Sequence, residues 1–198
     1  MLGPAIIDAI RIRRTVKSLT SALVLELNDL RDRLVEAAFT LGEIGGALDK
    51  DALEWFRSTL KKMPEPNKLT VDLVDDLLGR RAAEINQIIA ARVAQLSGET
   101  LLLPEYGVPV LDMALQYLPR FSAAVQRNML AIKTELSFLN QDAADIRQQY
   151  LLAFQKHVAE NLSAVVQANA ARTYRLAFTT ARNIINSATA AVRALGGT

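Results

Sequence analysis

Hydrophobic residues recur at steps of three and four along the first quarter of the chain. The members of this stripe are Val16, Leu19, Leu23, Leu27, Leu30, Leu34, Ala38 and Leu41. Such spacing places every member on one face of an α-helix. Ile6 and Ile10 extend the stripe toward the N-terminus, and the three glycines between 42 and 46 are typical of a helix end. The pattern therefore predicts one long amphipathic helix over residues 5–44.

A proline-containing break follows a second, shorter helix. This helix is expected over about 51–63, where apolar residues again keep a helical spacing. Pro64 and Pro66 stand one residue apart and cannot continue a helix. We expect 64–68 to connect two helices, and a boundary between two sub-units is the alternative.

The third predicted helix covers 70–97, with Thr70 as its N-cap. Its first turns hold three acids, Asp72, Asp75 and Asp76. This run resembles the aspartate-rich magnesium motif of all-α terpenoid synthases, because acids at such spacing could hold a hard cation from one helix face. Those enzymes need a second metal-binding motif on a facing helix, and the sequence offers no convincing one. The helix dipole and a salt bridge from Asp76 to Arg80 explain the acids, so we expect no metal site.

Residues 99–119 combine apolar side chains with three prolines, Pro104, Pro109 and Pro119. The apolar members are Leu101, Leu102, Leu103, Tyr106, Val108, Val110 and Leu111. We expect a loop that leads into a short helix ending near Pro119. The favoured interpretation is a plug in the core, packed against helices. The alternative is an exposed segment that docks on a partner or touches a membrane.

Two helices are expected in the C-terminal part of the chain, over 120–139 and 141–195, with Asn140 as the cap between them. No proline or glycine interrupts the second one, which would be about 80 Å long if continuous. It could then extend from the body, and a break near 161–163 or 169–173 is the alternative. Its narrow apolar stripe is rich in small residues, which predicts packing against another chain.

Together these patterns predict an all-α fold. We expect an elongated helical bundle of five to seven helices, with long amphipathic N- and C-terminal helices and a single helical domain over 1–198. The composition agrees, since 51% of residues are hydrophobic but only 6% are aromatic. Ala, Leu, Ile and Val supply most of the apolar residues, which suits helix packing better than a sheet.

The composition also restricts location and chemistry. There is no cysteine, which excludes disulfides and thiolate chemistry. The N-terminus does not resemble a signal peptide, because Asp8 interrupts the apolar start and the basic residues follow it. No stretch approaches the roughly 18 uncharged apolar residues of a membrane-spanning helix. We therefore expect no transmembrane segment, and a protein that is cytoplasmic or assembled into a particle.

Catalytic chemistry has little support in the sequence. His157 is the only histidine, and a general-base histidine normally needs a positioned partner. The glycines between 42 and 46 lack the lysine and the strand context of a phosphate loop. We expect a non-enzymatic protein that uses no cofactor.

Two groups of basic residues are the candidate partner-binding residues. The C-terminal group is Arg172, Arg175, Arg182 and Arg193, and the N-terminal group is Arg11, Arg13, Arg14 and Lys17. The four C-terminal arginines fall within about 80° on a helical wheel, with no acid after Glu160. The plain interpretation is a solvated face, or arginines paired with acids on another helix. The functional interpretation is binding to an acidic protein, anionic lipid or nucleic acid.

Three function classes remain open. The leading hypothesis is a structural, assembly or adaptor protein, such as a subunit of a virion or a secretion complex, acting through homo- or hetero-oligomeric helix contacts. The second is a membrane-active bundle that binds anionic lipid through basic amphipathic helices and the 99–119 loop. The third is a helical small-ligand binder or enzyme. Nucleic acid is not favoured, because the net charge is only +2 and no aromatic residues are interleaved with the basic ones.

Overall fold

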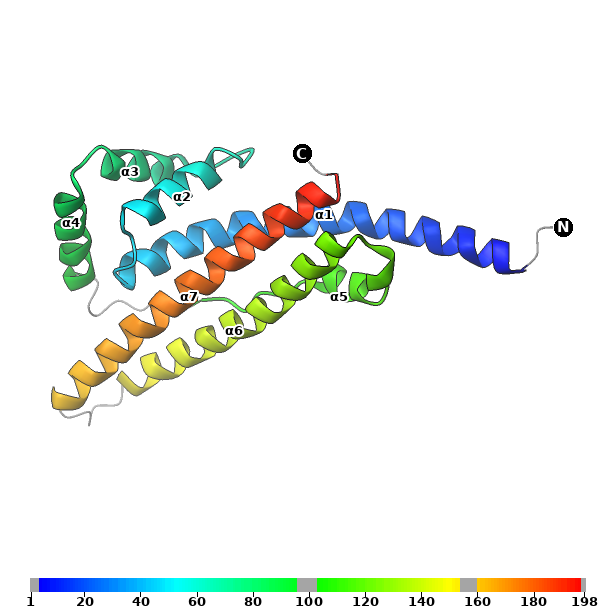
Figure 1. Cartoon of the computed structure of the whole chain (residues 1–198). Helices are drawn as coiled ribbons and strands as arrows, with labels where there is room; N and C mark the ends of the chain where they lie inside the picture. The colour runs from blue at the N-terminus through cyan, green and yellow to red at the C-terminus, as the bar shows by residue number, and fades with distance from the viewer. Residues whose placement is uncertain (1–3, 96–102, 154–159, 197–198) are drawn as a thin grey trace.

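The computed structural model describes residues 4–95, 103–153 and 160–196, and every regular element within these ranges is helical. In chain order the elements are α1 (Pro4–Ile44), α2 (Lys50–Leu60), α3 (Lys68–Leu78), α4 (Ala82–Gln95), α5 (Pro109–Leu115), the 3-10 turn η1 (Leu118–Arg120), α6 (Ala123–Ala153) and α7 (Glu160–Ala194). The all-α prediction is confirmed. The long helices α1, α6 and α7 give the bundle its elongated shape (Figure 1).

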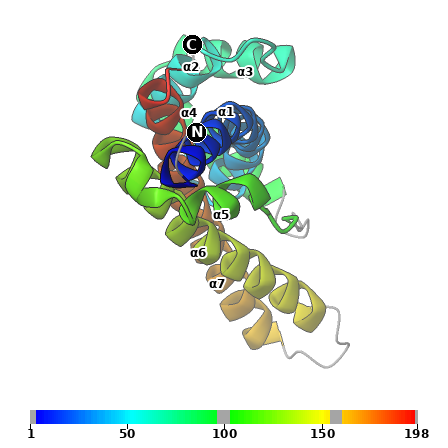
Figure 2. The same ribbon diagram turned by 90° about the vertical axis from the view of Figure 1, so that its right-hand side faces the viewer.

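The centre of the bundle is the contact of α7 with both α1 and α6 (Figures 1 and 2). The predicted leucine stripe of α1 is buried here, and its fully inaccessible members are Leu23, Leu27, Leu30, Leu34 and Leu41. The small residues of α7 that are equally inaccessible are Ala177, Ala181, Ala188 and Ala191. Small side chains let helix backbones approach closely. The prediction that this face packs against another chain is therefore wrong, because α1 and α6 of the same chain cover it.

The C-terminal helices differ from the predicted ranges 120–139 and 141–195. α6 continues through Asn140, and α7 runs back beside it, so that the two form an antiparallel hairpin (Figure 1). Residues 154–159, with His157 among them, lie outside the described residues. The distal part of the hairpin extends away from the other helices (Figure 2).

Asn140 does not cap a helix. Its side-chain oxygen accepts the backbone N–H of Tyr106 at 2.9 Å, and its side-chain nitrogen donates to the Tyr106 carbonyl at 3.0 Å. The side-chain amide of Asn140 thus satisfies both backbone groups of Tyr106 and fixes the preceding loop to α6. Asparagine is common at caps, but its amide satisfies any exposed backbone pair equally well.

The predicted helix over 70–97 is two helices, α3 and α4. Gly79 ends α3, and its N–H bonds back to carbonyls of the last turn. An isolated glycine within a helical pattern is a weak sign of a break, which is why the sequence did not reveal this one. The N-cap is Asn67, not Thr70, and its side-chain oxygen accepts the N–H of Leu69 at 3.0 Å.

The described part of the apolar loop, 103–119, packs into the core. Its buried residues are Leu103, Tyr106, Val108, Leu111 and Ala114. Glu26 on α1 accepts the backbone N–H groups of Val110 and Leu111 at 2.9 and 2.8 Å, and so caps α5 from a different helix. The interpretation as a core plug is confirmed for these residues, while 99–102 lie outside the described chain.

Candidate partner-binding surface

Arg175, in the predicted arginine stripe, is committed to the fold. Its Nε and Nη2 atoms donate to the carbonyl oxygen of Gly45 at 3.2 and 3.1 Å, just past the end of α1. A helix C-terminus carries unsatisfied carbonyls and a partial negative charge. Because α1 has no basic residue in its own last turn, the guanidinium from α7 supplies the missing cap.

The same place is the closest approach between the α1 terminus and α7. A Cβ atom on Gly45 would lie 2.9 Å from the backbone nitrogen of Arg175 and 2.9 Å from the carbonyl oxygen of Leu41. Contacts this short essentially never occur for a real side chain. Gly45 therefore lets Arg175 reach its cap position.

Arg182 is also engaged within the chain. Its guanidinium lies over the ring of Trp55 at 5.0 Å from the ring centroid, which is a cation–π distance. The indole N–H of Trp55 donates to Asn186 at 3.0 Å. These two contacts fasten α2 to α7.

Arg172 and Arg193, at the ends of the stripe, are exposed. Within the described ranges, none of the four stripe arginines forms an ion pair. The stripe is thus split between an occupied middle and two free ends about 30 Å apart along α7. The arginines do not form one continuous docking face.

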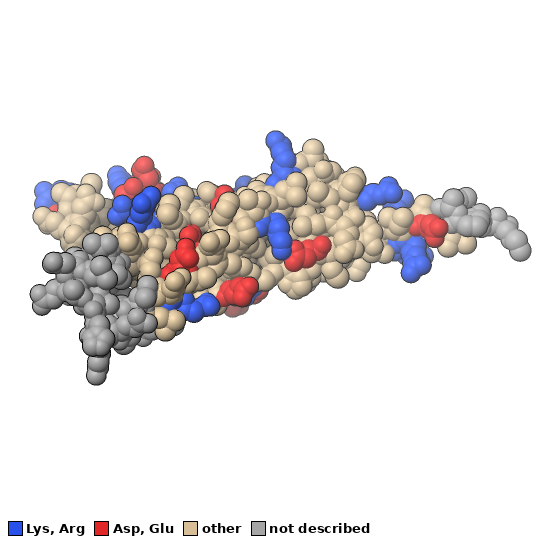
Figure 3. All heavy atoms as spheres, turned by 90° about the horizontal axis from the view of Figure 1, so that it is seen from below, with Lys and Arg blue, Asp and Glu red and all other residues tan. Residues whose placement is uncertain are grey.

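The second basic group has a different setting. The first turns of α1 extend past the other helices (Figure 1), and on the face seen in Figure 3 this tapered end carries Lys and Arg side chains beside one acidic group. Arg11, Arg13, Arg14 and Lys17 are all exposed, and none has an ion pair among the described residues. We call residues 7–18 the N-terminal arm. No acid follows Asp8 until Glu26, so the arm carries strong local positive charge.

The arm also exposes large apolar side chains. Ile7 is 55% exposed and Ile10 is 42% exposed. The prediction that Ile10 extends the buried stripe is wrong, because burial begins only around Val16 and Leu19. There are two reasons. Ile10 lies roughly 120° from Val16 on a helical wheel, so it is on a different side of α1 from the buried stripe, and the helices that cover α1 end before the arm begins (Figure 1).

The acids at 72–76 do not form a metal site among the described residues. Asp75 pairs with Arg57 on α2 at 3.3 Å, and Asp76 pairs with Arg80 at 2.9 Å as predicted. Their role is to fasten α3 to α2 and to stabilise the end of α3.

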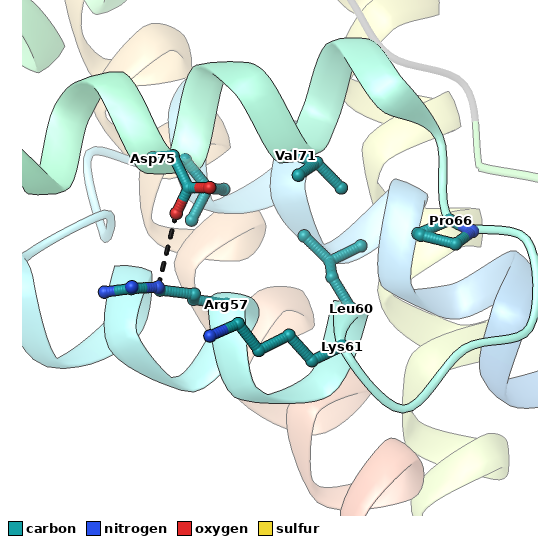
Figure 4. Close-up of a pocket in the computed structure, with 7 residues that line it drawn as sticks. Arg57, Leu60, Lys61, Pro66, Val71 and Asp75 are labelled. Atoms are coloured by element: carbon teal, nitrogen blue, oxygen red, sulfur yellow. Dashed lines mark ion pairs between the residues drawn. The ribbon is translucent and has the colours of Figure 1, made fainter.

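A small pocket lies beside the first of these ion pairs, between α2 and α3 (Figure 4). Its lining residues are Arg57, Leu60, Lys61, Pro66, Val71, Val74 and Asp75. The volume is about 100 Å³, whereas small-molecule sites commonly enclose about 300–1,000 Å³. The pocket is a shallow depression between packed helices, and two of its charged lining residues, Arg57 and Asp75, already pair with each other.

Tyr106 and Asp142 have perturbed pKa values. Burial raises the pKa of the Tyr106 hydroxyl, while Arg33, whose guanidinium is 6.0 Å from the ring centroid, lowers it by a smaller amount. Burial and the neighbouring Asp145 raise the pKa of Asp142 on α6. Each shift has a local structural cause, and neither group lines the α2–α3 pocket.

Comparison with protein-family models, with curated proteins and with solved structures finds no match to this chain. Among the helices that the structure describes, not one combines the length and apolar character of a membrane crossing. The N-terminal arm is therefore the candidate partner-binding surface.

Proposed function

We propose that this protein is a non-enzymatic assembly or adaptor protein, a subunit that joins a larger complex through contacts between helices. Complexes of the kind built in virion or secretion assembly are the expected setting. The observation that carries the proposal is the N-terminal arm, about 18 Å of helix that is exposed, basic and partly apolar. Exposed apolar groups beside unpaired charges are typical of interaction surfaces.

The rest of the molecule supports a scaffold role for the body. The faces of α1, α6 and α7 that meet are filled mostly by aliphatic side chains, and the loop over 103–119 closes one side. A rigid body with one projecting helix can present that helix at a fixed angle, which lowers the entropy cost of binding.

A membrane-active bundle is the second candidate, because a basic helix with exposed isoleucines also suits anionic lipid. Two features weigh against it. Within the described part of the loop, Leu103, Tyr106 and Val108 are buried in the core, and Met113 is the large apolar side chain that is exposed. On the arm, Ile7 and Ile10 lie on the same side as the cations, whereas a membrane-surface helix separates the two kinds of side chain onto opposite faces.

Site-specific photocrosslinking in the cells that make the protein tests the proposal. A photoreactive residue replaces Ile10 in the arm, and a matched variant carries it at Leu130 on α6, which is exposed to a similar degree, 49% against 42%. We expect protein adducts of discrete mass from position 10 that are absent from position 130. An adduct of twice the 21.7 kDa chain mass would identify a homo-oligomer. Only diffuse labelling at both positions, or lipid adducts alone, would contradict the proposal.

A further inference from the structure

The free side of the N-terminal arm carries a stripe at coiled-coil spacing. Ile7, Ile10, Arg14 and Lys17 follow one another at steps of three, four and three, and all four are exposed. This spacing aligns side chains along one seam of a helix. The seam is apolar toward the tip and cationic toward the body.

The body of the protein lies against a different side of the same turns. Ile12 and Val16 are partly buried, and Val16 packs against the core. On a helical wheel they lie roughly 100° or more from the seam. The seam is therefore unused by the fold.

We propose that this seam docks an acidic amphipathic helix of a partner protein, which presents apolar side chains to Ile7 and Ile10 and carboxylates to Arg14 and Lys17. This inference rests on the proposed assembly function and names the chemistry of its partner. Charge complementarity identifies the occupant, because Arg11 and Arg13 flank the seam with further positive charge. Flanking charges of this kind set the choice of partner in helix pairs.

A second copy of the arm is a poor occupant. In either orientation, two arms together would bring eight cations close to two acids, counted over residues 7–18 of each copy. Like charges facing one another across a helix pair are destabilising. Homo-oligomers through the arm alone are therefore disfavoured.

A pair of designed peptides tests the chemistry directly. The acidic probe is a fluorescent helical peptide of three heptads, with leucine along one seam and glutamate at the flanking positions, and the control probe has lysine in place of every glutamate. Binding to the full chain is followed by fluorescence anisotropy. We expect the acidic probe to bind, the lysine probe to fail, and hydrogen exchange to slow at residues 7–18 when the acidic probe is bound.

Matched variants locate the site. The double substitution Arg14→Glu with Lys17→Glu should weaken binding about tenfold or more. Arg172→Glu with Arg193→Glu, which makes the same change in net charge at exposed positions on α7, should leave it unchanged. Likewise Ile7→Ser with Ile10→Ser should weaken binding, whereas Leu69→Ser with Leu176→Ser, also exposed, should not. All these positions are on the surface, and circular dichroism checks that the variants stay folded.

Three outcomes would overturn the inference. One is failure of the acidic probe to bind, and another is an equal loss in both charge-reversed variants, which would indicate unspecific attraction. The third is binding to vesicles of phosphatidylserine and phosphatidylcholine without binding to the acidic probe. Discrete photocrosslinks at position 10 despite any of these results would leave the assembly function standing and remove only the acidic helix.

Discussion

Residues 7–18 and residues 19–44 belong to one continuous helix, α1, but only the second part is covered. Leu23, Leu27 and Leu30 are fully inaccessible, whereas Ile7 and Ile10 are about half exposed. Large aliphatic residues recur in both parts, but Ile7 and Ile10 lie on a different side of the helix from the buried leucines. The second part also has α7 and α5 alongside it, and the first part does not. Apolar spacing thus identifies a helix, and the neighbouring elements decide which part of it is core.

Shortening one side chain in each part of α1 should give the largest difference in the free energy of unfolding. Leu30→Ala removes a fully buried side chain and should lower the free energy of unfolding by about 2–5 kcal/mol. Ile10→Ala removes an exposed one and should change it by less than about 0.5 kcal/mol. Urea unfolding followed by circular dichroism measures both. A large loss at Ile10 would mean that the arm packs against the body in solution.

A steric clash just past the C-terminal end of α1 should have the next largest effect on the free energy of unfolding. Gly45→Ala places a methyl group 2.9 Å from the Arg175 backbone nitrogen, which forces α7 away from α1. We expect a loss of about 1–3 kcal/mol in unfolding free energy. Gly107→Ala is the control, because a Cβ there meets nothing within 4 Å. Equal stability of the two variants would contradict the close approach.

The arginine of α7 that caps α1 and an exposed arginine of the same helix should also differ in how much their replacement lowers stability. Arg175→Met keeps much of the apolar stem but removes the cap on α1, and should cost about 1 kcal/mol. Arg172→Met alters an exposed side chain with no partner among the described residues, and should be close to neutral. Thermal and urea unfolding of both variants provide the comparison. Similar values for the two would show that the contact with Gly45 contributes nothing.

The smallest expected effect is a dependence on pH at Asp142. Its folded-state pKa is raised above 3.8, so the folded protein holds this proton more tightly than the unfolded chain does. The stabilising contribution is therefore full below 3.8 and is lost as the pH rises through the raised pKa. Asp142→Asn should remove this loss and make the variant slightly more stable than the wild type near neutral pH. Unfolding curves measured from pH 3 to pH 7 check the sign, and a variant less stable at pH 7 would contradict it.

Local patterns predicted the helices well where they repeat over many turns. The α1 stripe, the Pro64 to Pro66 connector and the buried loop residues all follow from spacing or backbone chemistry. The sequence pattern did not predict the ends of α3 at Leu78 and of α6 at Ala153. No strong helix-breaking residue precedes either position in an otherwise helical pattern.

The candidate site shows the same limit. The basic groups can be recognised as clusters in the sequence. Whether each arginine is exposed or contacts another helix depends on residues far away in the chain. Arg175 meets Gly45, 130 positions earlier, and Arg182 meets Trp55. Neither pairing has a local signature. The capping of α5 by Glu26 was missed for the same reason, since a glutamate within a helix gives no sign of a distant partner.

The packing of α1 against α7 has a consequence for synthesis of the protein. α1 ends at Ile44 and α7 begins at Glu160, so the ribosome must add more than a hundred residues before the partner helix exists. At about 5–20 residues per second this delay is roughly 6–23 s. For that time the leucine face of α1 is a nascent amphipathic helix without its final cover. The chain is therefore expected to depend on chaperone protection while it is being made.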